Sequence, residues 1–266
     1  MLNTTFHDPA VLSIAQAIVA AAAALAVALL ARRRRIHVER DLAVALVRGF
    51  VQITVVGSVL LLMLRGPRPL GPAALAAMIV AAAATSARRA RRIPSAFRVS
   101  LYAIAGGAGS VIALMAALGV IDTAVTTLVP VGSMLVANAM NANGLALERF
   151  RSEVASHARH VEAALALGAA PGVSVAPYVA SSFHASLIPA IDSLRTLGIV
   201  WIPGLMTGMV LAGTPPVRAA IYQFVTIAMI FASSGLTCLI GTTLIRGRAF
   251  SPAEQLVLRP GPAGRR

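Results

Sequence analysis

Long apolar stretches constrain this chain more than any other feature of its sequence. A helix that crosses a bilayer needs about 20 mostly apolar residues, within a range of about 17–25. Seven stretches meet or approach this length: 11–31, 43–64, 70–87, 99–120, 123–147, 197–213 and 217–245. Charged residues make up only 12% of the chain, well below the share of about 25% usual in soluble domains. We therefore expect an all-α, polytopic membrane protein with about seven transmembrane helices.

The arginines predict how these spans are oriented, because cytoplasmic loops collect basic residues. With the cluster at 32–35 inside, alternation of the seven spans places most other arginines inside as well: Arg88, Arg89, Arg91, Arg92, Arg149, Arg151, Arg159, Arg195, Arg246 and Arg248. Only Arg65, Arg68 and Arg218 then fall outside. We therefore expect the N-terminus outside and the C-terminus inside. The short clusters beside apolar spans, without interleaved aromatic residues, also argue against nucleic acid as a partner.

One transmembrane domain is expected over residues 1–250, with 148–196 as a long cytoplasmic segment. Phe150, Val154, Val161 and Leu165 recur at helical spacing, which predicts an amphipathic helix that ends near Gly168. Such a helix could dock on a soluble partner or lie in the headgroup layer of the bilayer. The tail at 251–266 is rich in Pro, Gly and Arg, and we expect it to be disordered.

Several motifs occur in the order of a known permease family. The residues Glu162-Ala163-Ala164, followed by Gly168, resemble the EAA loop of ABC-transporter permeases, the coupling helix that contacts the nucleotide-binding subunit. The wider pattern comprises "VPVGSMLVANAMNANGLALERF", "EAALALGA", "LIPAIDSLRTLGIVWIPGLMTGMVLAG" and "AIYQFVTIAMIF". Together these stretches resemble the permease family that includes the bacterial Fet-type iron exporter and plant aluminium-tolerance proteins, over about residues 40–250.

This resemblance implies a permease subunit that exports iron, another metal or a metal-related solute across the cell's inner (plasma) membrane. It further implies a permease homodimer paired with a separate ABC-type ATPase that binds ATP and Mg²⁺, and coupling through Glu162, Ala163, Ala164 and Gly168. The sequence itself contains no G-x-x-x-x-G-K-[ST] phosphate loop, so we expect no cofactor on this chain. Two other functions stay open: an ATP-independent secondary transporter or channel, and a non-transporting scaffold or intramembrane enzyme.

Polar residues inside spans are the candidates for a transport path, because they are costly in lipid and often functional. Met134, Asn138 and Asn141 share one helix face, whereas Asn143 points away and is expected to hold neighbouring helices together. Asp192 and Arg195 are spaced to form a pair on a helix, expected at the inner membrane surface. Pro203 is expected to break the sixth span just before Met206. Glu153, His157 and His160 have metal-ligand spacing but lie on a predicted surface helix, so a metal site stays undetermined.

Overall fold

The computed structural model describes residues 9–34, 37, 39–64, 70–90, 93 and 95–258, and these residues form helices joined by turns. The chain divides into two compact units, Met1–Gly66 and Pro67–Arg266. The first unit contains α2 (Pro9–Arg33) and α3 (Glu39–Leu64), which pack on each other and are joined near an Arg32–Glu39 ion pair of 3.5 Å. Most of their described apolar side chains are exposed, as expected for helices covered by lipid.

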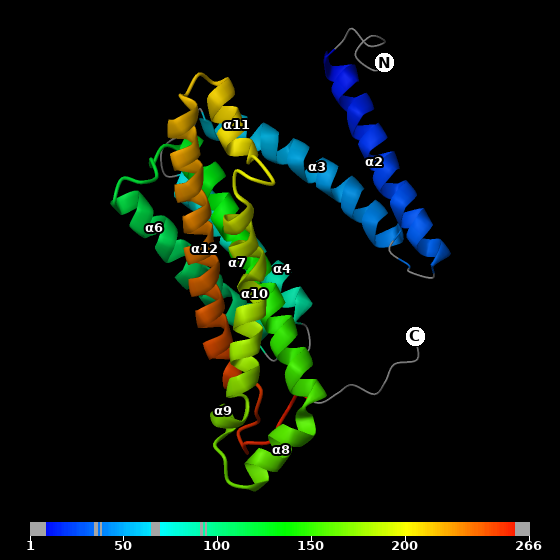
Figure 1. The fold of residues 1–266 in the computed structure, drawn as a ribbon, viewed down its shortest axis with the longest axis vertical. Helices are drawn as coiled ribbons and strands as arrows, with labels where there is room; N and C mark the ends of the chain where they lie inside the picture. Colours follow the sequence, from blue (N-terminus) through cyan, green and yellow to red (C-terminus); the bar gives the residue numbers. More distant parts are fainter. Residues whose placement is uncertain are drawn as a thin grey trace. The chain divides into compact units, whose positions relative to one another are not determined.

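The second unit contains the remaining helices, which Figure 1 shows as a bundle of long elements with short ones at its ends. Their bounds are α4 (Leu70–Arg89), α5 (Ala96–Ile104), η1 (Ala105–Gly109), α6 (Ser110–Ala117), α7 (Val125–Ser156), α8 (Ala158–Ala166), α9 (Pro171–Ser174), α10 (Ala176–Thr196), α11 (Gly204–Leu211) and α12 (Pro216–Arg246). The π-helical turn η1 continues α5 into α6, so these three elements form one helical path from Ala96 to Ala117.

Helix α7 is the centre of this bundle and packs most extensively against α12 and α4. Contacts show that α4, α7 and α12 run in the same direction. Asn143 of α7 meets Ser86 of α4 and Gly241 of α12. Earlier in α7, Gly132 lies against Leu75 of α4 and Leu135 meets Ser233 of α12. Helix α10 runs the opposite way, because Ser181 near its start bonds Glu153 near the end of α7. We call the two ends of the bundle the α8 end and the α11 end, after the short helices that lie there (Figure 1).

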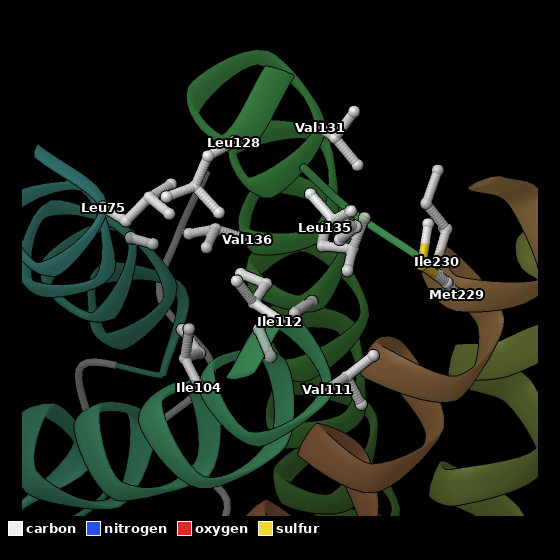
Figure 2. Packing of buried hydrophobic residues seen from close by; sticks show 14 of the residues in the cluster. Leu75, Ile104, Val111, Ile112, Leu128, Val131, Leu135, Val136, Met229 and Ile230 are labelled. Atoms are coloured by element: carbon white, nitrogen blue, oxygen red, sulfur yellow. The ribbon is translucent and has the colours of Figure 1, made fainter. Parts of the chain in front are cut away.

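The two largest apolar clusters among the described residues lie within the bundle. The larger cluster joins α4, α5, α6, α7 and α12, and Figure 2 shows Leu75, Leu128 and Val136 pointing toward one another beside Ile104 and Ile112. The second, which we call the α8-end cluster, combines 13 buried residues: Ala90, Ile93, Ala96, Val99, Leu147, Phe150, Val154, Val161, Val175, Ile245, Ala249, Leu256 and Leu258. The predicted amphipathic face of Phe150, Val154 and Val161 is therefore buried against this chain's own helices.

Among the described residues, six helices are long and apolar enough to cross a membrane: Ile14–Arg33, Glu39–Ser58, Leu70–Arg89, Ala96–Ala117, Val125–Ser156 and Pro216–Arg246. The predicted all-α membrane fold is thus confirmed. The predicted span at 197–213 is wrong in position, since that stretch contains a turn followed by the 8-residue α11. The 21-residue α10 instead lies beside α7 and α12. Its serines, His184 and Asp192 lower its hydropathy, so it resembled a loop in the sequence.

The position of α10 corrects two further expectations. Residues 176–196 were predicted to be part of the cytoplasmic segment 148–196, but they pack along the bundle, so the segment outside it is confined to the end of α7, α8 and α9. Arg195 was predicted on the same side as Arg149. However, α10 runs opposite to α7, and Ser193 and Trp201 line a cavity with Met134, so Arg195 lies toward the α11 end. Both expectations failed because α10 is a helix of the bundle and not a loop.

The tail prediction is also wrong in part. Residues 249–258 fold back on themselves, with hydrogen bonds from Ser251 N–H to the Gln255 carbonyl and from Val257 N–H to the Ala249 carbonyl. Leu256 and Leu258 are each only 4% exposed, in the α8-end cluster. These leucines account for the order, because they bury apolar surface despite the Pro/Gly-rich composition around them. Residues 259–266 of the predicted tail lie outside the described residues.

Candidate functional site

The three asparagines of α7 occupy two different environments. Asn143 is fully buried, and its Nδ2 donates to Ser86 Oγ at 2.9 Å and to Ser100 Oγ at 3.2 Å. Gly241 leaves room for it, since a Cβ there would collide with Asn143 Oδ1. Asn143 therefore ties α7 to α4 and α5 and lies against α12, which is the packing role expected from the sequence. Asn138 and Asn141 are exposed on the face directed to α10.

The face that carries Asn138 lines two cavities between α7 and α10. The first, which we call the α11 cavity, has a volume of about 230 Å³. It is lined by Met134, Asn138, Pro189, Ala190, Ser193, Trp201, Pro203, Gly204, Leu205, Gln223, Ile227 and Ile230. The second, the Arg89 cavity, has about 190 Å³ and is lined by Arg89, Asn138, Asn141, Ala142, Leu145, Ser186, Pro189, Ala190 and Ser234. Asn138, Pro189 and Ala190 line both, so the two cavities adjoin at this point.

The α11 cavity is shaped by the turn that follows α10. Gly198 adopts φ +76°, a conformation that glycine reaches without a steric penalty, and its N–H donates to the Trp201 carbonyl at 3.1 Å. The chain then continues in extended form through Pro203, which is buried and precedes the first turn of α11. This turn places Trp201 and Pro203 beside the same cavity as Met134 and Asn138 of α7. The predicted helix break at Pro203 is therefore present, and it forms one wall of the cavity.

The other predicted path residues are distributed unevenly. Met134 and Pro203 line the α11 cavity together with Asn138, whereas Met206 lines neither cavity. Asp192 and Arg195 form an ion pair of 3.7 Å between Oδ1 and Nη1, with both side chains more than half exposed. Such an exposed pair contributes little to stability, typically about 0–1 kcal/mol. The pair lies at the α11 end, whereas the sequence had placed Arg195 on the same side as Arg149.

Two further residues line these cavities: Arg89, which the sequence did not connect with a path, and Gln223, for which the sequence favoured hydrogen bonding in the core. Arg89 Nη2 donates to Asn141 Oδ1 at 3.3 Å, and Gly144 accommodates its stem, since a Cβ there would lie 3.0 Å from Arg89 Cδ. The sequence placed Arg89 only in a basic cluster beside a span, because its contact with Asn141 joins residues that are 52 positions apart in the chain. Gln223 of α12 lines the α11 cavity and is 1% exposed. The feature of the sequence that pointed to a role for Gln223 was its position as an isolated amide in an apolar helix.

The EAA-like residues lie on α8 and the turn that ends it. Glu162 and Ala163 are exposed, Ala164 is half-buried, and Gly168 adopts φ +87° with open space around its Cα. Gly168 N–H donates to the Leu165 carbonyl and Ala169 N–H to the Ala164 carbonyl, the paired bonds of a Schellman motif, which favours glycine at this position. The neighbouring Leu167 is 89% exposed. The α8 turn therefore presents an apolar tip outside the bundle.

The junction of α7 and α8 is also fixed to α10. The chain bends at His157, whose ring stacks on Tyr178 with centroids 5.1 Å apart, and Ser181 Oγ donates to Glu153 Oε1 at 2.8 Å. Glu153 and His157 are thus used in local contacts, and the described residues contain no cluster of three or more His, Cys, Asp or Glu that could hold a metal. These contacts make the end of α7, α8 and the start of α10 one connected structure.

Comparison with known proteins identifies the family. A family model described as "Uncharacterised protein family (UPF0014)" matches residues 14–250, which include nearly all of the described helices. The chain belongs to this family. The rice UPF0014 membrane protein STAR2 is 32% identical over 240 residues, or 90% of this chain and 84% of the rice protein. No solved structure matches the chain significantly.

Other relatives confirm the family resemblance predicted from the sequence. The probable iron export permease protein FetB of Escherichia coli K12 is 30% identical over 235 residues, covering 86% of this chain and 89% of its own length. The protein ALUMINUM SENSITIVE 3 of Arabidopsis thaliana is 31% identical over 241 residues, covering 88% of each chain. The chain is therefore a helical membrane protein of the UPF0014 family, with a permease among its relatives.

Proposed function

We propose that this chain is the membrane-spanning permease subunit of an ABC transporter that exports iron, another metal or a metal-related solute. In this proposal a separate ABC-type ATPase binds ATP and Mg²⁺, and two copies of the permease form the complex in the plasma membrane. The observation that carries the proposal is the continuity between the exposed α8 turn and the helices that line both cavities. The relative named as a probable iron export permease supports the choice of cargo.

The coupling route follows from the contacts at the α8 end. A partner that displaces α8 would also displace α7, because the chain bends directly from one helix into the other at His157. Val154 and Val161 are packed with Ile245 of α12 in one apolar cluster, so the three helices cannot shift independently without losing buried surface. Both α7 and α10 supply cavity-lining residues. Movement of α8 would therefore change the shape of the candidate path.

The α8 end is proposed to face the cytoplasm. Most arginines of the second unit's described residues lie there: Arg88, Arg89, Arg98, Arg149, Arg151, Arg159, Arg246 and Arg248. Only Arg195 and Arg218 lie at the α11 end. This asymmetry follows the preference of cytoplasmic loops for basic residues. It agrees with an ATPase binding at α8, and with α10 as a further crossing that would bring the total to seven.

Coexpression with a stand-alone ABC ATPase from the same organism tests the proposal. We expect the two proteins to purify together, and we expect inside-out vesicles containing both to take up iron only when ATP and Mg²⁺ are supplied. A vesicle preparation with a non-hydrolysing ATPase variant is the control. Iron uptake by this chain alone, independent of ATP, would instead favour a secondary transporter or channel. A folded chain that neither binds an ATPase nor moves iron would favour a scaffold.

A further inference from the structure

The side chain of Gln223 is buried at the wall of the α11 cavity without using either of its polar atoms. Neither Nε2 nor Oε1 has a hydrogen-bond partner among the described residues, and the side chain is only 1% exposed. Among the side chains in the described part of the chain, Gln223 alone has two such buried atoms. Buried polar groups in folded proteins are nearly always hydrogen-bonded, so an amide left unpaired on both sides indicates a missing partner.

The cavity beside Gln223 offers further polar groups on its other walls. Asn138 of α7 uses one amide hydrogen to bond the Met134 carbonyl at 2.8 Å, which leaves the rest of its amide available. Ser193 of α10 donates to the Pro189 carbonyl at 2.8 Å, so its oxygen can still accept. Trp201 and Met134 add apolar surface. Three helices thus bring uncharged hydrogen-bonding groups to one cavity.

The charge of this cavity restricts what it can hold. None of the described residues that line it is ionisable, and the nearby Asp192 and Arg195 pair with each other. A bare cation or an anion would lose its hydration without gaining an opposite charge, which is costly away from water. A hydroxyl or carboxamide group, by contrast, can accept from the Gln223 Nε2–H and donate to its Oε1 at the same time. The cavity volume of about 230 Å³ fits a small solute or one part of a larger one.

We propose that the α11 cavity is a solute-binding site in which Gln223 recognises an uncharged group that is both a donor and an acceptor, such as a hydroxyl or a carboxamide. This inference deepens the proposed function, because it assigns the recognition of the cargo's neutral part to the same path. A metal cargo would then pass as a complex whose ligand carries such groups, and not as the bare ion.

The only tryptophan of the chain, Trp201, lines this cavity, so tryptophan fluorescence reports on its occupancy directly. The experiment uses the purified full chain in detergent, without an ATPase, titrated separately with erythritol, propionamide, sodium succinate and zinc chloride. We expect a saturable fluorescence change with erythritol or propionamide. We expect none with succinate or zinc ions, because no charge of the cavity would compensate theirs.

The variant Gln223→Met keeps nearly the same side-chain volume but removes both polar atoms. It should weaken binding of the neutral probe at least about tenfold, which corresponds to about one lost hydrogen bond. Asn138→Leu, on the α7 wall, should weaken binding as well and provides a second test if Gln223→Met fails to fold. The matched control is Gln52→Met on α3, a residue outside this cavity, which should bind as the original chain does.

The outcomes separate this inference from the proposed function. The assignment of the site would be overturned by any one of three results. These are no saturable response to either neutral probe, an unchanged response in Gln223→Met, and a response to zinc ions alone. Each result is obtained without an ATPase, so failure to find an ATPase partner leaves it unaffected. Conversely, an ATP-driven complex whose Trp201 fluorescence ignores both neutral probes would retain the proposed function and refute this site.

Discussion

Replacing Gly107 with alanine should disturb the contact between η1 and α12. A Cβ built on Gly107 would lie 2.5 Å from the backbone nitrogen of Thr237 and 2.6 Å from its Cα, and closer still to its Oγ1. Rotation of the Thr237 side chain cannot relieve the two backbone contacts, so α12 must move away by roughly 1 Å to reach ordinary van der Waals separation. The small residues of the "GGAGS" stretch at 106–110 thus allow η1 and α12 to pack closely.

The expected cost follows from this displacement. Forced overpacking of a close-packed interior usually costs about 1–3 kcal/mol, and the upper part of this range, about 2–3 kcal/mol, applies where backbone must move. The better helix propensity of alanine offsets about 1 kcal/mol of this cost. We therefore expect Gly107→Ala to lower the free energy of unfolding by about 1–2 kcal/mol. The assay is thermal unfolding in detergent, followed by the loss of the monodisperse peak in size-exclusion chromatography.

The same helical turn provides the controls for this measurement. A Cβ on Gly106 would meet only the end of the flexible Ile240 side chain at 3.1 Å, and one on Gly109 would meet Ile79 Cδ1 at 3.9 Å. Gly109→Ala should leave the Tm unchanged or raise it slightly, and Gly106→Ala should fall between the two. A Gly107→Ala protein as stable as Gly109→Ala would refute the packing argument.

Three other predictions concern the ends and centre of the bundle. Leu256→Ala should cost about 2–5 kcal/mol in unfolding free energy, whereas Val257→Ala, at a side chain that is 46% exposed, should change the Tm little; equal effects would contradict the ordered tail. Asn143→Ala should cost about 1–2 kcal/mol through two lost hydrogen bonds, and an unchanged Tm would argue against its packing role. Asn138→Leu should reduce iron transport in vesicles without lowering the Tm, because its side chain is exposed to the cavities; full transport would remove it from the path.

The sequence predicted well those features that depend on local pattern. Apolar length located α2, α3, α4, α7 and α12, and the angular position of Asn143 separated it correctly from the other asparagines of α7. Both depend on contacts between residues a few positions apart on one helix, and the 3.6-residue period determines these.

Features that depend on tertiary packing could not be predicted in the same way. Helix α10 is polar enough to resemble a loop, and its place in the bundle depends on contacts such as Ser186 to Cys238, 52 residues away. Leu256 and Leu258 are ordered because they pack in a cluster whose other members come from helices distant in the sequence. The Arg89–Asn141 contact likewise joins two helices whose relative rotation no local pattern specifies.

The most direct test of the proposed coupling is the rate of ATP hydrolysis by the partner ATPase, measured with and without this chain. Gly168→Val should abolish most of the stimulation while the complex still assembles, because a β-branched residue at φ +87° costs about 1–2 kcal/mol and distorts the α8 turn. Gly247→Val is the matched control, since Gly247 has φ −72° and open space around it. We expect stimulation by the original chain and by Gly247→Val but not by Gly168→Val. Equal stimulation by all three, or none by the original chain, would contradict it.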